Sequence, residues 1–220
     1  MKKCLSQEGL KLIACITMLI DHTGAILFPD LLWLRMIGRL AFPIFCFLLS
    51  QGLHYTKNKP KYLLRLTLWM IISEFAFDYA VFGGFTWSHQ SVYVTLLLGA
   101  LMGLCIEKLP KYLKILPVIP FALLASDLHT DYGDYGILLI ALFIFTRDIP
   151  YKTLFQLAGL IVLNIATNQA AIQFYSILAI IPIFLYNSKK TFHSKALQWG
   201  FYAFYPVHLA ILHLINTLFR

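Results

Sequence analysis

The feature of this 220-residue chain that most constrains its fold is a series of apolar stretches separated by short, basic loops. Hydrophobic residues make up 60% of the chain and charged residues only 13%, whereas a soluble domain carries roughly 25% charged residues. Each stretch is long enough, with tilt or partial burial, for a hydrocarbon core of about 30 Å. We therefore predict an all-α, polytopic membrane helical bundle with about nine transmembrane helices. The predicted spans are residues 10–28, 34–54, 62–82, 92–106, 112–126, 133–146, 154–166, 172–186 and 196–218.

The connections between these spans alternate between basic ones and ones without Lys or Arg. On one side lie Lys2, Lys3, Lys11, Lys57, Lys59, Lys61, Arg65, Lys108, Lys111, Lys114, Arg147, Lys152, Lys189, Lys190 and Lys195. The opposite loops, at residues 83–91, 127–134 and 167–171, carry none. The positive-inside rule then predicts a cytoplasmic N-terminus and an outer C-terminus in a multi-pass protein of a cell membrane, in bacteria the cytoplasmic one. The same rule explains the net charge of +8, so we expect no nucleic-acid partner.

The remaining composition indicates one transmembrane domain over residues 1–220. The four cysteines show no CxxC or metal-type spacing, so we expect small buried side chains, no disulfide framework and no metal. The first apolar run has no small-residue cleavage site and is interrupted by Asp21 and His22. We therefore expect a retained first helix and not a signal peptide.

Four ionisable residues near the first hairpin form the candidate site. Asp21 and His22 lie deep in the first span, and Arg35 and Arg39 open the second at a four-residue spacing that places them on one helix face. Ionisable side chains at membrane depth are costly and indicate function by default. Neighbouring helical residues project about 100° apart, so Asp21 is expected to pair with an arginine while His22 faces a cavity. A purely structural ion pair is the alternative.

Further polar residues could join this site. Glu74 and Asp78, near the outer end of the third span, could bind the arginines or fulfil a structural role. Tyr205 and His208 of the last span are secondary cavity candidates, and Lys61 and Arg65 could bind phosphate, although topology alone accounts for them. The acidic loop at 127–134 has the composition of a weak metal or acceptor site, or simply of an outer loop.

Several of these motifs are identified as those of the TraX family, named for the protein that acetylates the N-terminus of conjugative pilin. The resemblance is carried by Met18-Leu-Ile-Asp-His-Thr-Gly24, the segment 35–45 and Tyr202-Ala-Phe-Tyr-Pro-Val-His208. Residues 10–14, Gly52, 61–65 and 95–99 also fit. A more distant similarity links the first His, the Arg of the second helix and the turn at 45–52 to the membrane-bound acyltransferase-3 superfamily. The resemblance implies acyl transfer from acetyl-coenzyme A, presented from the cytoplasm, to an acceptor at the membrane.

Acyl transfer from a thioester needs a base for the acceptor and donors for the tetrahedral oxyanion. We assign His22 as the general base or acyl-handling residue. Arg39, or Arg35, would stabilise the developing negative charge or hold a coenzyme A phosphate, and Asp21 would position the arginine. The acceptor is an amine or a hydroxyl of a peptide, glycan or lipid. Two other readings stay open: a proton-coupled transporter or flippase, which lacks support from repeats or broken helices, and a non-catalytic membrane partner subunit.

Overall fold

The computed structural model describes residues 3–189 and 194–219 and is built from helices. Within these residues the only β-type pairing is two isolated bridges, Leu5 with Tyr186 and Gln90 with Thr130. The predicted all-α class is therefore confirmed. Lys2, Lys190 and Arg220, which enter the charge pattern above, lie outside the described residues.

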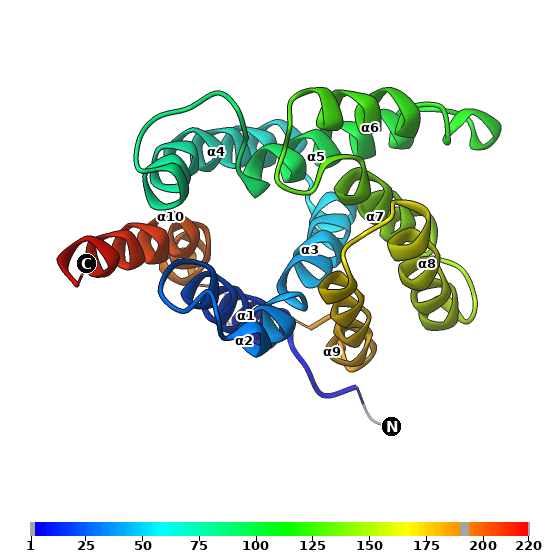
Figure 1. Cartoon of the computed structure of the whole chain (residues 1–220). Coiled ribbons are helices and arrows are strands. Elements are labelled where there is room, and N and C mark those ends of the chain that lie inside the picture. The colour runs from blue at the N-terminus through cyan, green and yellow to red at the C-terminus, as the bar shows by residue number, and fades with distance from the viewer. Residues whose placement is uncertain (1–2, 190–193, 220) are drawn as a thin grey trace. The chain divides into compact units, whose positions relative to one another are not determined.

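The chain forms two compact units, and the first contains residues 1–45, 75–85 and 169–220. Its helix α1 (Gln7–Ile26) packs against both α2 (Leu32–Gly38) and α10 (Lys195–Leu218), as Figure 1 shows. The 3₁₀ helix η2 (Ala171–Ala179) packs against α2 and continues into α9 (Ile180–Phe184). This unit thus brings helices from both ends of the chain together around α1.

Helix α1 has clear sequence signals at its N-terminus. The Ser6 side chain accepts a hydrogen bond from the backbone N–H of Gly9 at 3.1 Å, and Glu8 lies in the first turn, where an acidic group favours the helix dipole. Its apolar faces are long enough for a membrane, while Asp21 is buried near its other end at 7% exposure. The helix therefore carries a polar group deep into an apolar packing surface.

The second predicted span is interrupted. Helix α2 ends at Gly38, Arg39 is its C-cap, and α3 (Ala41–Tyr55) begins after Leu40. Pro43 explains the break, because a proline has no N–H to bond the carbonyl four residues earlier, that of Arg39, and its ring crowds that carbonyl. The prediction that Arg35 and Arg39 lie within one unbroken helix is thus corrected: Arg39 caps a short helix.

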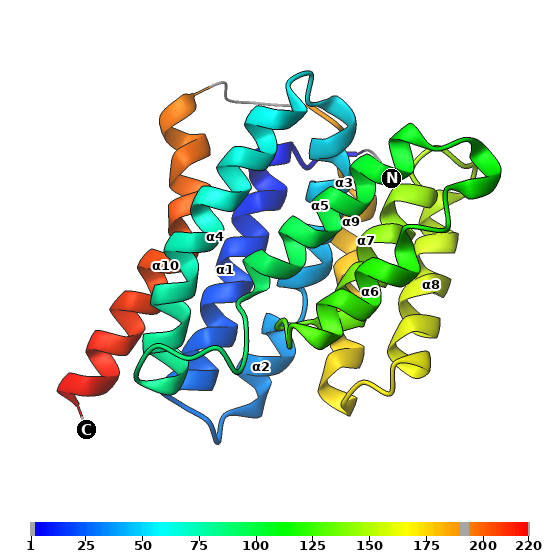
Figure 2. The same cartoon turned by 90° about the horizontal axis from the view of Figure 1, so that it is seen from above.

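The second unit contains residues 46–74 and 86–168. It includes α5 (Val92–Lys108), the short η1 (Lys111–Leu113), α6 (Val118–Asp127), α7 (Gly133–Phe145) and α8 (Lys152–Ala166). Helix α7 is its centre, packing against α5, α6 and α8, and α8 lies beside it in Figure 2. The side chains of Ile137, Leu139, Ile140 and Phe143 are fully buried there. Helices α3 and α4 (Lys59–Phe82) contribute residues to both units.

Three described helical segments are long and apolar enough to cross a membrane: Gln7–Ile26, Leu32–Tyr55 and Lys195–Leu218. Helix α4 has 24 residues but is not among these three, and several other predicted spans coincide with shorter helices. Helix α6 has 10 residues, about 15 Å at 1.5 Å per residue, which is half of a hydrocarbon core of about 30 Å. A count of nine spans and the orientation of the N-terminus therefore stay predictions.

Candidate functional site

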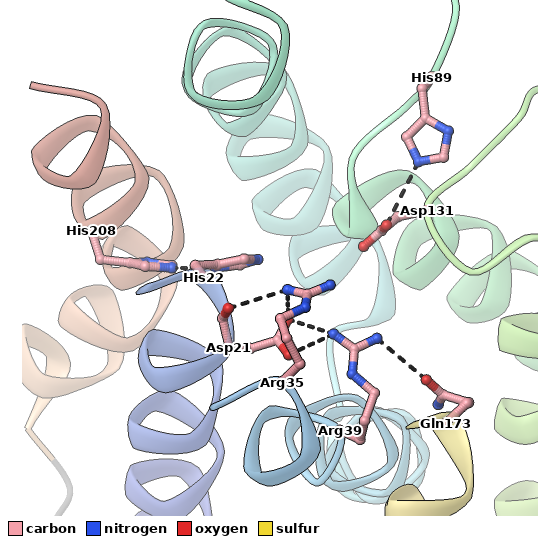
Figure 3. A network of polar contacts seen from close by, with 8 residues as sticks. All are labelled: Asp21, His22, Arg35, Arg39, His89, Asp131, Gln173 and His208. Carbon is pink, nitrogen blue, oxygen red and sulfur yellow. Dashed lines mark hydrogen bonds and ion pairs between the residues drawn. The ribbon is translucent and has the colours of Figure 1, made fainter. Parts of the chain in front are cut away.

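The carboxylate of Asp21 holds both arginines of the first hairpin. Nη1 of Arg35 donates to Oδ2 at 2.7 Å, while Nη2 of Arg39 donates to Oδ1 at 2.6 Å and to Oδ2 at 2.5 Å. A further bond from Arg35 Nη1 reaches the backbone carbonyl of Asp21 at 3.1 Å. Figure 3 shows the two guanidinium groups converging on this one carboxylate. The predicted pairing across the hairpin is present, and with both arginines instead of one.

Two glycines let the backbones of α1 and α2 come close enough for this contact. A Cβ on Gly38 would collide with Oδ1, Cβ and Cγ of Asp21, and a Cβ on Gly24 would lie 2.7 Å from the Cβ of Leu34. Real Cβ atoms do not approach that closely, so any larger residue would separate the two helices or displace the carboxylate. The short α2 is therefore placed directly over Asp21 by the absence of a side chain at Gly38.

A third group, Gln173 of η2, completes the surroundings of Arg39. Its Oε1 accepts from Nη1 of Arg39 at 3.3 Å, and the residue is 4% exposed. In a 3₁₀ helix, residues three apart lie on one face, so Gln173, Ser176 and Ala179 share a buried side. Sequence reasoning missed Gln173, although two polar residues at a three-residue spacing in an apolar stretch were a usable signal.

His22 has its polar partner on α10 and not on α2. Its Nδ1 lies 2.6 Å from Nε2 of His208, and the two rings are nearly coplanar, with centroids 4.9 Å apart and planes at 20°. Tyr205, one turn before His208, presents its ring edge-on to His22 at 5.8 Å between centroids. Neighbouring positions on a helix point about 100° apart, which explains why Asp21 contacts α2 while His22 contacts α10. Figure 3 shows both contacts side by side on α1.

The exposed fractions of these side chains divide them into two groups. Asp21, His208 and Tyr205 are buried, at 7%, 5% and 3% exposure. The Arg35 side chain keeps 30% of its surface exposed, and His22 is half-buried. His22 and Arg35 are thus partly exposed. Each is bonded to a buried group, His22 to His208 and Arg35 to Asp21. Such a pair can move a proton and bind an anion.

The other predicted residues are distributed differently. Asp78 is buried within the first unit, at 1% exposure. Glu74 belongs to the second unit, where its carboxylate accepts from the Ser91 hydroxyl at 2.6 Å and from the Ser91 backbone N–H at 3.0 Å. Ser91 is the N-cap of α5, so Glu74 satisfies the N-terminus of that helix, a structural role.

Lys61 and Arg65 also lie in the second unit, in the first turns of α4. The Lys61 side chain is exposed, and the half-buried Arg65 guanidinium lies 5.9 Å from the centroid of the Tyr62 ring. These two basic residues therefore belong to the other unit than the residues gathered around α1.

The acidic loop contributes one ion pair to the second unit. Nε2 of His89 lies 3.6 Å from Oδ1 of Asp131, next to the bridge between Gln90 and Thr130. Hydrogen bonding to Asp131 raises the pKa of His89 above its usual value, with the charges of Asp131 and Glu74 acting in the same direction and burial opposing them. Among the residues with described positions, no three His, Cys, Asp or Glu side chains gather as metal ligands.

Comparison with known proteins relates nearly the whole chain to one family. A family model described as TraX protein matches residues 6–216. The chain is 31% identical to a probable fimbrial assembly protein FimC, serogroup H1, of Dichelobacter nodosus, over 92% of each chain. It is 26% identical to Protein TraX of Escherichia coli K12, over 94% of this chain and 85% of that protein. No solved structure matches it. The more distant similarity to the acyltransferase-3 superfamily stays a prediction.

Proposed function

Since this chain belongs to the TraX family, we propose that it is an integral membrane acyltransferase, which transfers an acetyl group from acetyl-coenzyme A to an amine or hydroxyl acceptor. The observation that carries the proposal is the position of His22, half-buried and bonded to His208, beside the arginine pair on Asp21. Within the described residues, the three segments that carry these side chains are also the three that are long and apolar enough to cross a membrane.

His22 would act as the general base. The acceptor N–H or O–H gives its proton to the imidazole as its nitrogen or oxygen bonds to the acetyl carbon, and the carbon–sulfur bond of the thioester then breaks. The leaving sulfur takes the proton back from the imidazolium, so coenzyme A leaves as a thiol and the enzyme is unchanged. Histidine suits both transfers because its usual pKa lies near the working pH.

Arg35 would stabilise negative charge at the reacting centre. As the acceptor adds, the thioester oxygen becomes an oxyanion, and a guanidinium with exposed N–H groups can donate to it. The 30% exposure of the Arg35 side chain supports this role. Arg39, at 12% exposure and bonded to Asp21 and Gln173, suits a fixed position behind Arg35. Asp21 would orient both groups.

The donor would come from the cytoplasmic side of a bacterial cytoplasmic membrane, where coenzyme A is present. The bilayer would present the acceptor, a peptide amine, a glycan or a lipid. No step in this scheme uses a metal ion.

Binding of the donor tests this proposal. Full-length protein purified in detergent should bind acetyl-coenzyme A saturably and hydrolyse it slowly, with water replacing the acceptor. Arg35→Gln should slow hydrolysis at a saturating concentration of the donor. Absence of binding by folded protein would overturn the proposal in favour of a proton-coupled transporter or a partner subunit.

A further inference from the structure

The hydrogen bonds of His208 determine which of its ring nitrogens carries a proton. Nδ1 lies 2.6 Å from the backbone carbonyl oxygen of Phe204, one turn earlier in α10. A carbonyl oxygen can only accept a hydrogen bond, so Nδ1 of His208 must be the donor. In a neutral imidazole one nitrogen donates and the other accepts, so Nε2 of His208 holds a lone pair.

This assignment propagates to His22. Nε2 of His208 faces Nδ1 of His22 at 2.6 Å, so a bare Nε2 on His208 requires a proton on Nδ1 of His22. A neutral His22 then has its lone pair on Nε2, the ring nitrogen that does not contact His208. Charge on the buried His208 ring is costly, which favours the neutral pair.

We propose that His208 is a positioning residue that, anchored on the Phe204 carbonyl, holds His22 in the tautomer with a proton on Nδ1 and a lone pair on Nε2. This inference rests on the proposed function, because it names the nitrogen of His22 that acts as the base. It also gives His208 a second task. When Nε2 of His22 gains a proton, the resulting imidazolium keeps a hydrogen-bond acceptor on its Nδ1 side.

The packing around His208 supports a fixed ring. The Phe204 ring stacks on it with centroids 5.0 Å apart and planes at 22°, and Tyr205 meets it edge-on at 5.8 Å. The residue is 5% exposed, so water does not compete freely for its nitrogens. An acceptor held in this way fixes the tautomer and the orientation of the neighbouring histidine. In hydrolases a carboxylate fixes the catalytic histidine in the same way.

Nitrogen-15 NMR of full-length protein, labelled on histidine and held in lipid nanodiscs at neutral pH, tests the tautomer without any acyl donor. The His22 signals are identified by their loss in His22→Ala. We expect a protonated Nδ1 and an unprotonated Nε2 on His22. In His208→Phe, which keeps a ring but has no acceptor, His22 should shift toward the tautomer protonated at Nε2 that free histidine favours.

Two further variants separate a positioning role from simple packing. In His208→Gln the side-chain oxygen falls near the position of Nε2, so the tautomer should be restored, whereas His208→Asn is too short and should resemble His208→Phe. The control His213→Phe changes another half-buried histidine of α10 and should leave the His22 signals unchanged.

The loss of activity in the variants should parallel the change in the His22 tautomer. In His208→Phe the hydrolysis of acetyl-coenzyme A should fall by up to roughly 100-fold, the lower end of what a general base contributes, with unchanged donor affinity. A proton on Nε2 of His22 in the native protein, or a doubly protonated ring on either residue, would overturn the inference. So would an unchanged His22 tautomer in folded His208→Phe. A correct tautomer in a protein that binds no acyl donor would instead count against the proposed function alone.

Discussion

Arg39 and Asp21 share a forked contact, in which one nitrogen, Nη2, lies 2.6 Å from Oδ1 and 2.5 Å from Oδ2 of the carboxylate. Arg35 donates to the same Oδ2 at 2.7 Å. The two guanidinium groups therefore share one buried carboxylate, that of Asp21. The ion pairs at Asp21 therefore contribute to the stability of the first hairpin and to the position of Arg35, together with the bonds from Arg35 to the Asp21 carbonyl and from Arg39 to Gln173.

Asp21→Asn should destabilise the protein strongly. The amide keeps the shape of the carboxylate but leaves two guanidinium groups without their negative partner, and breaking a buried ion pair costs about 3–5 kcal/mol. Thermal unfolding in detergent should show a much lower midpoint. The same substitution at Asp30, exposed in the loop that follows α1, should leave the midpoint unchanged. Equal midpoints for the two variants would contradict the assigned role.

Gly38→Ala should also lower the unfolding midpoint. The added Cβ would occupy the space of Oδ1 and Cγ of Asp21, and overpacking of this kind costs about 1–3 kcal/mol. Gly200→Ala is the matched control, because Gly200 lies in α10 with nothing within 4 Å of an added Cβ. That change should raise stability by about 0.5–1 kcal/mol through helix propensity. A neutral Gly38→Ala would show that α2 does not need its close approach to Asp21.

Gln173→Leu should destabilise the protein by about 1–3 kcal/mol, because a buried N–H of Arg39 loses the acceptor that it has in the structure. Gln173→Glu keeps an acceptor oxygen at the same place and should retain most of the stability. Thermal unfolding of the two variants gives the comparison. If Leu and Glu behave alike, the contact between Arg39 and Gln173 contributes nothing measurable.

The ion pair between His89 and Asp131 should make stability depend on pH. The pKa of His89 is raised in the folded protein, so the pair stabilises the fold fully below the ordinary histidine value of 6.5. The effect is lost as the pH rises through the raised value. Because both side chains are about one-third exposed, the gain should stay within about 1 kcal/mol.

Unfolding midpoints measured between about pH 5.5 and 8.5 check this sign, since histidine titrates in that window. At each pH the midpoint of Asp131→Asn is subtracted from that of the native protein, so that the contributions of other titrating groups cancel. It should be largest at the acidic end and vanish at the basic end. A difference that grows toward basic pH would contradict the assigned pairing.

The sequence predicted the local features of this protein better than the distant ones. The apolar stretches predicted where helices lie, because length and hydropathy are local properties. The pairing of Asp21 with the arginines could be predicted because a loop of five residues, 27–31, joins their helices. The break before α3 was missed, although Pro43 marks it in the sequence.

Tyr205 and His208 were predicted as secondary groups of the site that contains His22, but the individual contacts between distant segments could not be predicted. His22 and His208 are 186 residues apart, and only the packing of α10 against α1 brings their rings together. Gln173 carries no charge, so no rule about ionisable groups in membranes identified it as a partner of Arg39. Glu74 had the right chemistry for an arginine partner, yet it caps α5 through Ser91. A candidate carboxylate in a sequence does not reveal which neighbour it binds.

The rate at which His22→Ala hydrolyses acetyl-coenzyme A shows whether His22 is the general base. The measurement compares purified native protein, His22→Ala and His213→Ala, each shown to be folded and to bind the donor. We expect His22→Ala to bind the donor normally and to lose at least about 100-fold in rate, the contribution of a general base, while His213→Ala is unaffected. A folded His22→Ala variant that hydrolyses the donor at the native rate would contradict it.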